Sequence, residues 1–315
     1  MTGAAGFVGR HLVRRLVEEG TRVRASDRAF AQEGRAFFDR LGVELVTADL
    51  ARPDTLEPLF EGDVDRVFHL GAICNFSTPF VALEPVNVRG VRRVADLALA
   101  ARVRCFVHVS STSVYGRYRG SPFTEESLRE PQDDYGRSKK AGEDEIFAAM
   151  ERGLPTVVAR PCTVYGPGCN DGAGKAFSRR TSIPAIPGSG RQKLANVRVE
   201  DVARALVHLS TTEGTIGHAY NVVDRSQPTV EEALGLAASA FGARPPRLHL
   251  PLGLLSALAR VSAAVARRRG TVPDLEQDAL RYLRDDYVVD GSKLAATGFE
   301  LLYPDFSGSL AQMVA

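Results

Sequence analysis

A glycine turn at the start of the chain constrains the fold more than any other feature of the sequence. The first residues read M-T-G-A-A-G-F-V-G, and apolar residues from Leu12 to Val17 then recur at the spacing of one helix face. Glycines at positions 3, 6 and 9 permit a tight turn, close approach of the backbone to a pyrophosphate, and close packing of the next helix. The N-terminus of that helix adds N–H donors and a positive dipole end. The turn therefore predicts a dinucleotide-binding unit.

An acidic residue stands where such a unit needs one. A second strand-like run, 21–25, leads to Asp27, 18 residues after Gly9. An acid near that distance is expected to bind the hydroxyls of the adenosine ribose. Asp27 favours NAD over NADP, because a 2′-phosphate would meet like charge. Arg28 follows at once and could accommodate that phosphate, so NADP stays open.

Strand-like and helix-like runs alternate along most of the chain. This order predicts an α/β fold, a doubly wound parallel sheet of the Rossmann type, with a smaller and mainly helical C-terminal cap. The expected strands are 43–47, 66–70, 105–110, 156–159 and 219–223, and the expected helices are 88–101, 139–151, 229–241, 254–267 and 273–283. We divide the chain into a dinucleotide-binding domain, 1–165, to which 196–223 returns, and a substrate-binding region with the cap, 166–315.

A tyrosine, a lysine and a serine have the spacing of an acid/base set. Tyr135 and Lys139 lie four residues apart in D-D-Y-G-R-S-K-K, and Ser111 lies 24 residues before Tyr135. Residues i and i+4 share a helix face, so the ammonium can lie beside the phenol. A nearby cation is expected to lower the pKa of the phenol. Tyr135 could then exchange a proton with an alcohol or ketone near neutral pH, while Ser111 holds the same oxygen.

These motifs together resemble the extended short-chain dehydrogenases/reductases, the NAD-dependent epimerase/dehydratase superfamily. The matching segments are T-G-x-x-G-x-x-G, A-D-L (48–50), H-L-G-A (69–72), N-V-R-G (87–90), S-S-x-x-V-Y-G, Y-x-x-x-K and R-P-x-x-V-Y-G-P-G (160–168). The resemblance implies the catalytic set Ser111, Tyr135 and Lys139. It also implies that the cofactor is bound by Gly3, Gly6, Phe7, Val8, Gly9, Asp27, Arg28, Asp49, Leu50, Leu70, Gly71, Ala72, Tyr135, Lys139 and Pro161.

The substrate signals favour one branch of this superfamily. Nucleotide-sugar members carry a phosphate-gripping arginine where this chain has Leu194, and R-D-D-Y-V-V-D-G-S-K-L (284–294) replaces their second phosphate motif. That segment, with G-F-E-L-L-Y-P-D-F (298–306), resembles the 3β-hydroxysteroid dehydrogenase-like branch. Dehydration is not expected, because Thr112 and Ser113 stand where dehydratases have an Asp-Glu pair. The candidate substrate contacts are Thr112, Asn75 and Arg198.

The sequence thus predicts an NAD(P)-dependent oxidoreductase that interconverts a secondary alcohol and a ketone on an apolar or sugar-like substrate. Two alternatives stay open. A nucleotide-sugar 4-epimerase would use the same three residues with transient hydride transfer. A non-catalytic dinucleotide sensor would bind the cofactor without turnover.

Composition and charge exclude several other classes. The net charge of +2 gives no sign of nucleic-acid binding, and the four cysteines show neither C-x-x-C pairing nor a histidine at metal spacing, so no metal is expected. Reduced thiols fit a cytoplasmic protein. No apolar run reaches the roughly 18 residues of a membrane span. The apolar run 251–266 is read as a cap helix, or as the wall of a lipid pocket or a patch on a membrane surface. A homodimer stays open.

The sequence departs from the family pattern at its start. The family places a buried apolar strand immediately before the glycine turn, whereas only Met1 and Thr2 precede Gly3 here. We expect a gap, or a substitute segment, at the centre of the sheet, and further apolar β-branched residues upstream in the full-length protein.

Overall fold

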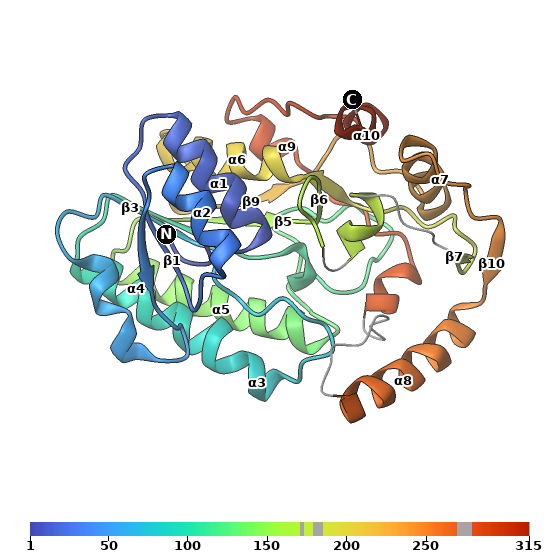
Figure 1. Cartoon of the computed structure of the whole chain (residues 1–315), viewed down its shortest axis with the longest axis horizontal. Helices are drawn as coiled ribbons and strands as arrows, with labels where there is room; N and C mark the ends of the chain where they lie inside the picture. The colour runs from blue at the N-terminus through green and yellow to red at the C-terminus, as the bar shows by residue number, and fades with distance from the viewer. Residues whose placement is uncertain (171–172, 179–184, 270–278, 315) are drawn as a thin grey trace.

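A parallel sheet with helices on both faces forms the larger part of the molecule (Figure 1). The structure is a computed structural model that describes residues 1–170, 173–178, 185–269 and 279–314. Strands β1 and β2 form one parallel pair, and β3, β4, β5 and β9 follow one another in a four-stranded parallel part. Their bounds are β1 Arg24–Asp27, β2 Glu44–Thr47, β3 Arg66–His69, β4 Cys105–Val109, β5 Thr156–Pro161 and β9 Ala219–Val222.

The residues ahead of the glycine turn join these two parts. Thr2 bridges Ser26 of β1 on one side and His69 of β3 on the other, both in parallel. Its N–H donates to the carbonyl of Phe68 at 3.0 Å, and the Met1 carbonyl accepts from Ser26 at 2.8 Å. We expected a gap or a substitute segment here. Instead Met1 and Thr2 themselves pair with the carboxyl ends of both neighbouring strands, which places the turn at the centre of the sheet.

The alternation of side chains along the strands decides which helices cover which face. Val67, Phe106 and Val158 pack with α4 and α5, whereas Phe68 and Val107 pack with α1 and α6 on the opposite face. Figure 1 shows α1 and α6 above the sheet and α4 and α5 below it. The helices of this part are α1 Phe7–Glu18, α2 Gln32–Arg40, α3 Phe80–Glu84, α4 Val91–Ala100, α5 Asp134–Glu151, α6 Val199–Thr211 and α9 Ser292–Ala295.

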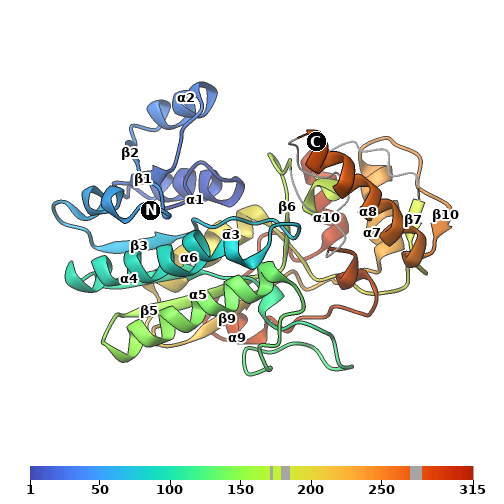
Figure 2. The same cartoon turned by 90° about the horizontal axis from the view of Figure 1, so that it is seen from below.

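A second cluster of elements forms the cap, at the right of Figures 1 and 2. Its core includes Ile186, Leu234 and Phe306. Its elements are β7 Ala185–Pro187, α7 Val230–Ala240, β10 Leu248–Leu250, α8 Leu252–Arg269, the 3₁₀ turn η6 Ala279–Leu283 and α10 Phe306–Val314. Strand β6 (Thr163–Tyr165) pairs with β8 (Asn196–Arg198) outside the main sheet. The division at residue 165 stays a prediction.

Most predicted elements agree with the observed ones to within a few residues, and two differ. Helix α5 begins at Asp134 rather than at 139, because the Asp133 side chain caps it by accepting from the Gly136 N–H at 2.8 Å. Of the expected helix 273–283, residues 273–278 lie outside the described residues, and 279–283 form the 3₁₀ turn η6.

A buried ion pair fastens α5 to the sheet. Arg160 on β5 donates from Nε and Nη2 to the two carboxylate oxygens of Glu143, at 2.9 and 2.8 Å. The two side chains are 3% and 0% exposed. Arg160 Nη1 also donates to Tyr115 Oη at 2.9 Å, and Tyr115 in turn donates to Asn221 on β9. The pair therefore joins α5, β5 and β9 in one buried network.

We predict that Glu143→Ala lowers the free energy of unfolding by about 3–5 kcal/mol, because it leaves the Arg160 guanidinium buried without its counter-ion. Urea denaturation measures the change. Glu145→Ala is the control on the same helix: its partner Arg92 is 60% exposed, so the expected loss is about 0–1 kcal/mol. Equal losses of unfolding free energy in the two variants would contradict the stabilising role of the buried Glu143–Arg160 pair.

Candidate active site

The predicted cofactor residues gather at one edge of the sheet. Asp27 ends β1, Asp49 and Leu50 follow β2, the segment 70–72 follows β3, and Pro161 ends β5. Because these strands are parallel, their carboxyl ends meet at the same edge, where ligands of such sheets bind. Leu50 packs against the segment 70–72, since a Cβ added to Gly71 would stand 2.7 Å from Leu50 Cδ1.

The glycine turn has the geometry that a pyrophosphate needs. Gly3 adopts a positive φ of 71°, and a Cβ on Gly9 would stand 2.1 Å from the Gly3 carbonyl oxygen. Gly6 is exposed, and a Cβ there would meet only that same oxygen, at 3.2 Å. Phe7 and Val8 follow in the first turn of α1, whose N-terminus has no side-chain cap. The residues present fit a dinucleotide, because backbone N–H groups face outward at a helix N-terminus.

Asp27 lies directly beside this turn. One carboxylate oxygen accepts from the Ala5 N–H at 3.0 Å, and the other accepts from the Arg28 N–H at 2.8 Å. Asp27 is half-buried and Arg28 is exposed. The acid is thus held by the turn itself, which is the arrangement expected for binding ribose hydroxyls.

The structure brings Tyr135, Ser111 and Lys139 together. Tyr135 and Lys139 lie on successive turns of α5, and both are buried. The phenol is hydrogen-bonded to the side chain of Ser111. Lys139 Nζ donates to the Val109 carbonyl, at the end of β4, at 2.8 Å. A cation, a phenol and a hydroxyl therefore meet at the carboxyl end of the sheet.

Close packing holds Ser111 in place. Ser111 precedes the 3₁₀ turn Thr112–Val114, and its Oγ accepts from the Ser113 N–H at 3.1 Å. A Cβ on Gly136, in the first turn of α5, would stand 2.7 Å from the Ser113 carbonyl oxygen. The absence of that Cβ lets α5 approach the 3₁₀ turn, so Tyr135 comes within reach of Ser111.

The pKa of Tyr135 differs from the sequence expectation. Burial, followed by the neighbouring Cys74 sulfur, raises the pKa of the phenol well above its usual value, although the hydrogen bond with Ser111 opposes this. Burial also lowers the pKa of the Lys139 ammonium to about 8, opposed by Cys74 and Glu143. The predicted lowering of the Tyr135 pKa is thus corrected for the protein alone, because the loss of hydration outweighs the hydrogen bond with Ser111.

Cys74 is a site residue that the sequence analysis missed. Its sulfur is hydrogen-bonded to Tyr135 and raises the pKa of Lys139. Asn87 holds this loop in place by exchanging hydrogen bonds of 2.8 and 3.0 Å with Ile73 and donating to Ser138 on α5 at 2.9 Å. The sequence offers one signal that could have identified Cys74 as a site residue: it lies two residues after the matching segment 69–72. The four cysteines form no disulfide in the described part of the chain.

An aromatic wall, which we define as Phe76, Tyr282 and Tyr287, stands beside the tyrosine. The ring of Phe76 lies 5.1 Å from Tyr135 and 5.6 Å from Tyr282, which in turn lies 5.4 Å from Tyr287. Tyr282 donates to the Asp133 carboxylate at 2.6 Å. The wall unites a loop after β3 with the cap, so no local sequence pattern could have predicted it.

The three candidate substrate residues are placed differently. Thr112 is buried next to Ser111, and its carbonyl accepts from the Tyr287 hydroxyl at 2.5 Å. Asn75 caps its own loop, accepting from the Ser77 N–H and the Thr78 hydroxyl.

Arg198 requires a correction. It is 3% exposed, donates to both carboxylate oxygens of Glu200, and donates to the carbonyl and hydroxyl of Ser309 on α10. Its guanidinium also lies 4.4 Å from the centre of the Tyr303 ring. These contacts commit the guanidinium to packing α10, so Arg198 is not available to grip a substrate phosphate.

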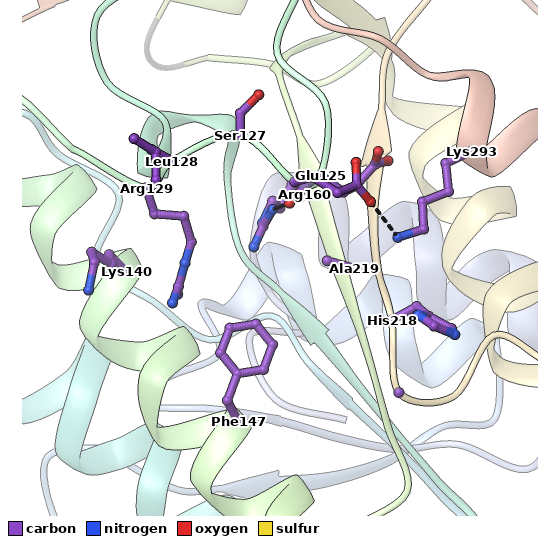
Figure 3. Close-up of a pocket in the computed structure, with 12 residues that line it drawn as sticks. Glu125, Ser127, Leu128, Arg129, Lys140, Phe147, Arg160, His218, Ala219 and Lys293 are labelled. Atoms are coloured by element: carbon purple, nitrogen blue, oxygen red, sulfur yellow. Dashed lines mark hydrogen bonds and ion pairs between the residues drawn. The ribbon is translucent and has the colours of Figure 1, made fainter.

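A cavity of about 490 Å³ lies elsewhere, beside the second half of α5 (Figure 3). Its lining includes Arg129, Arg160 and Lys293, and none of the predicted site residues. Arg160 is paired with Glu143, and Lys293 with Glu126 at 3.3 Å. These pairs neutralise the charges of the cavity, which gives it no clear ligand preference.

The described ranges lack two features. Within them no helix combines the length and the apolar character needed to cross a bilayer. Across the same ranges no group of three or more His, Cys, Asp and Glu side chains could hold a metal ion.

The fold and this arrangement define a dinucleotide-dependent enzyme of the extended short-chain dehydrogenase type. The chain belongs to the NAD dependent epimerase/dehydratase family, whose model matches residues 1–222. The family is NAD dependent, which agrees with the predicted cofactor NAD. The relatives include a reductase and an epimerase, so the alternative of a non-catalytic sensor is not supported.

Two relatives and one solved structure illustrate the range of the family. A ceramide reductase of Caulobacter vibrioides is 35% identical over 266 residues, covering 84% of this chain and 77% of the relative. A UDP-glucose 4-epimerase of Mycolicibacterium smegmatis is 34% identical over 278 residues, covering 79% of this chain and 86% of the relative. The UDP-glucose 4-epimerase of Thermus thermophilus, solved with NAD, superposes with a TM-score of 0.78 at 24% identity. The superposition covers 99% of this chain and 96% of the epimerase.

We predict that Lys139 makes stability depend on pH. Its ammonium has a pKa of about 8 in the folded chain against an ordinary value of 10.5. Between these values the unfolded chain binds more protons, so the free energy of unfolding should rise with pH. The free energy of unfolding of the wild type minus that of Lys139→Met should therefore rise between pH 8 and pH 10.5. Urea denaturation at a series of pH values measures both. Lys140→Met, which removes a lysine that pairs with Asp144 at the surface, is the matched control.

A second prediction concerns cofactor choice. NAD should bind at least ten-fold more tightly than NADP, about 1.4 kcal/mol. Asp27→Asn should narrow this gap, because it removes the charge that repels a 2′-phosphate while keeping an acceptor for the Ala5 N–H. Calorimetric titration measures both affinities, with the exposed Asp39→Asn as the control. If the wild type instead preferred NADP, the attraction of Arg28 for the 2′-phosphate would outweigh the repulsion by Asp27.

Proposed function

We propose that this enzyme interconverts a secondary alcohol and a ketone on an apolar substrate, with Tyr135 as general acid/base. The single observation that supports this proposal most is the hydrogen bond between the Tyr135 phenol and Ser111, with the Lys139 ammonium on the next turn of the same helix. A proton donor and a hydroxyl that can share one substrate oxygen are what carbonyl reduction requires.

Each residue has a distinct part in this mechanism. Ser111 orients the substrate oxygen, and Tyr135 gives that oxygen a proton in reduction or takes it in oxidation. Lys139, held by the Val109 carbonyl, stabilises the phenolate that remains and binds the nicotinamide ribose. The turn 3–9 and Asp27 hold the pyrophosphate and the adenosine ribose. NAD, when bound, supplies the hydride acceptor.

The surroundings of Tyr135 support an apolar substrate. The aromatic wall and Cys74 present carbon and sulfur surfaces to the phenol. Leu194 occupies the position of the family's phosphate-gripping arginine, and the nearby Arg198 is committed to Glu200 and Ser309. A surface of this composition gains binding energy from apolar contact rather than from a diphosphate.

A nucleotide-sugar 4-epimerase is the second candidate, supported by the identity to the epimerase of M. smegmatis. The two functions differ in stoichiometry. Net oxidation releases one NADH for each substrate molecule converted, whereas epimerisation leaves the NADH absorbance unchanged at the end of the reaction. Screening sterol-like alcohols, long-chain ketones and UDP-sugars with both readouts separates them.

We further propose that the protein acts in the cytoplasm, supported by cysteines that form no disulfide in the described part of the chain. Residues 166–315 are proposed as the substrate-binding region. A homodimer stays a prediction.

We predict that Tyr135→Phe lowers turnover by about 100-fold or more, because the variant keeps the ring but loses the proton donor. The affinity for NAD should stay nearly unchanged, which calorimetry checks. Lys139→Met should lower both turnover and affinity. Tyr118→Phe, in the loop after the 3₁₀ turn, is the matched control and should retain wild-type turnover. A Tyr135→Phe variant with near wild-type rate would refute the assignment.

A further inference from the structure

Helix α8 carries an exposed apolar stripe, which we define as Leu254, Leu258, Val261 and Val265. Their side chains are 49%, 48%, 62% and 41% exposed. At 100° per residue the four positions fall within an arc of about 60° on the helix. Large apolar side chains scattered singly over a surface are ordinary, but a continuous row along one helix marks an interaction site.

The opposite side of α8 already has its partners. Ala259 is fully buried, and the Leu252 side chain would stand 3.2 Å from a Cβ on Gly188 of the cap. Helix α8 also contacts the turn η6. Figure 1 shows α8 along the outer edge of the cap. The stripe therefore faces away from the protein core.

The segment that carries the stripe has charge of one sign. From residue 233 to residue 273 the sequence contains no Asp or Glu and six arginines. Arg260 and Arg268 are exposed on α8, and Arg244 and Arg247 are exposed on the segment before it, next to the 60% exposed Leu248. The whole chain has a net charge of only +2, so this surface concentrates positive charge that the rest of the molecule balances.

We infer that the α8 stripe and its arginines dock the protein on an anionic lipid surface. A basic helix with one apolar face lies in the plane of a membrane interface, with the apolar side chains among the acyl chains and the arginines at the headgroups. Each arginine near such a surface adds to the attraction of anionic lipid. A protein partner would need acidic side chains to match the exposed arginines, which are Arg244, Arg247, Arg260 and Arg268, and a second copy of this segment does not offer them.

The helix that carries the stripe is also joined to the active site. Helix α8 contacts η6 on its packed side, and η6 carries Tyr282, whose ring meets Phe76 beside Tyr135. The docking itself does not depend on the reaction, so it is testable apart from catalysis.

Flotation of the whole protein with lipid vesicles tests the inference. Vesicles of phosphatidylcholine with phosphatidylglycerol should bind the protein, and vesicles of phosphatidylcholine alone should bind it much more weakly. Binding should fall as salt is raised. The double variant Leu258→Ser with Val261→Ser should weaken binding about ten-fold or more. Arg260→Gln with Arg268→Gln should weaken it by a similar factor.

Matched controls lie on other surfaces. Val81→Ser with Leu302→Ser removes two apolar side chains that are 73% and 57% exposed, and Arg22→Gln with Arg40→Gln removes two exposed charges. Both controls should float like wild type, and all variants should keep wild-type NAD affinity, which shows that they are folded. Equal binding to both kinds of vesicle, or equal losses in variants and controls, would overturn the inference. So would a wild-type dimer that Leu258→Ser with Val261→Ser converts to a monomer, because a second copy would then cover the stripe.

Discussion

The ion pair between Glu143 and Arg160 is the interaction on which the rest of the site depends. Tyr135, Lys139 and Glu143 stand at i, i+4 and i+8 of α5 and thus share one face of the helix. Because Glu143 is bonded through both oxygens to an arginine of β5, α5 cannot rotate about its axis without breaking a buried charge pair. The rotation that satisfies this pair is the one that directs the phenol and the ammonium toward the carboxyl edge of the sheet.

Several close contacts then complete the site around α5. Asn87 ties the loop after β3 to Ser138, Gly136 admits the 3₁₀ turn that begins after Ser111, and the Val109 carbonyl receives Lys139. Together these contacts bring the carboxyl ends of β3 and β4 to the same helix. The ammonium of Lys139 is buried at a cost that lowers its pKa. A stable fold that tolerates such a cost keeps the charge for binding and catalysis rather than for its own stability.

The sequence predicted the parts of this site that are local. The glycine turn and the Tyr-x-x-x-Lys spacing lie within single elements, so their patterns carry the geometry directly, and the parallel sheet follows from alternating runs. Cys74, Phe76 and Tyr282 could not be predicted in the same way, because their proximity to Tyr135 arises from tertiary packing. The direction of the Tyr135 pKa was wrong for a related reason: spacing shows the neighbouring cation but not the extent of burial. The interpretation of Arg198 failed because its partners Glu200 and Ser309 include one from α10, 111 residues away.

The double role of Asp133 has a consequence for the order in which the chain assembles during synthesis. One oxygen of Asp133 caps α5 through Gly136, three residues on, and the other accepts from Tyr282, 149 residues on. Domains form from the N-terminus as the ribosome extends the chain. The first bond can therefore form as soon as the helix emerges, whereas the second must wait until nearly the whole chain has left the ribosome. Nascent chains would hold the helix of Tyr135 and Lys139 early and acquire the aromatic wall late, so a partly made protein would present the Tyr135 phenol without the cap tyrosines beside it.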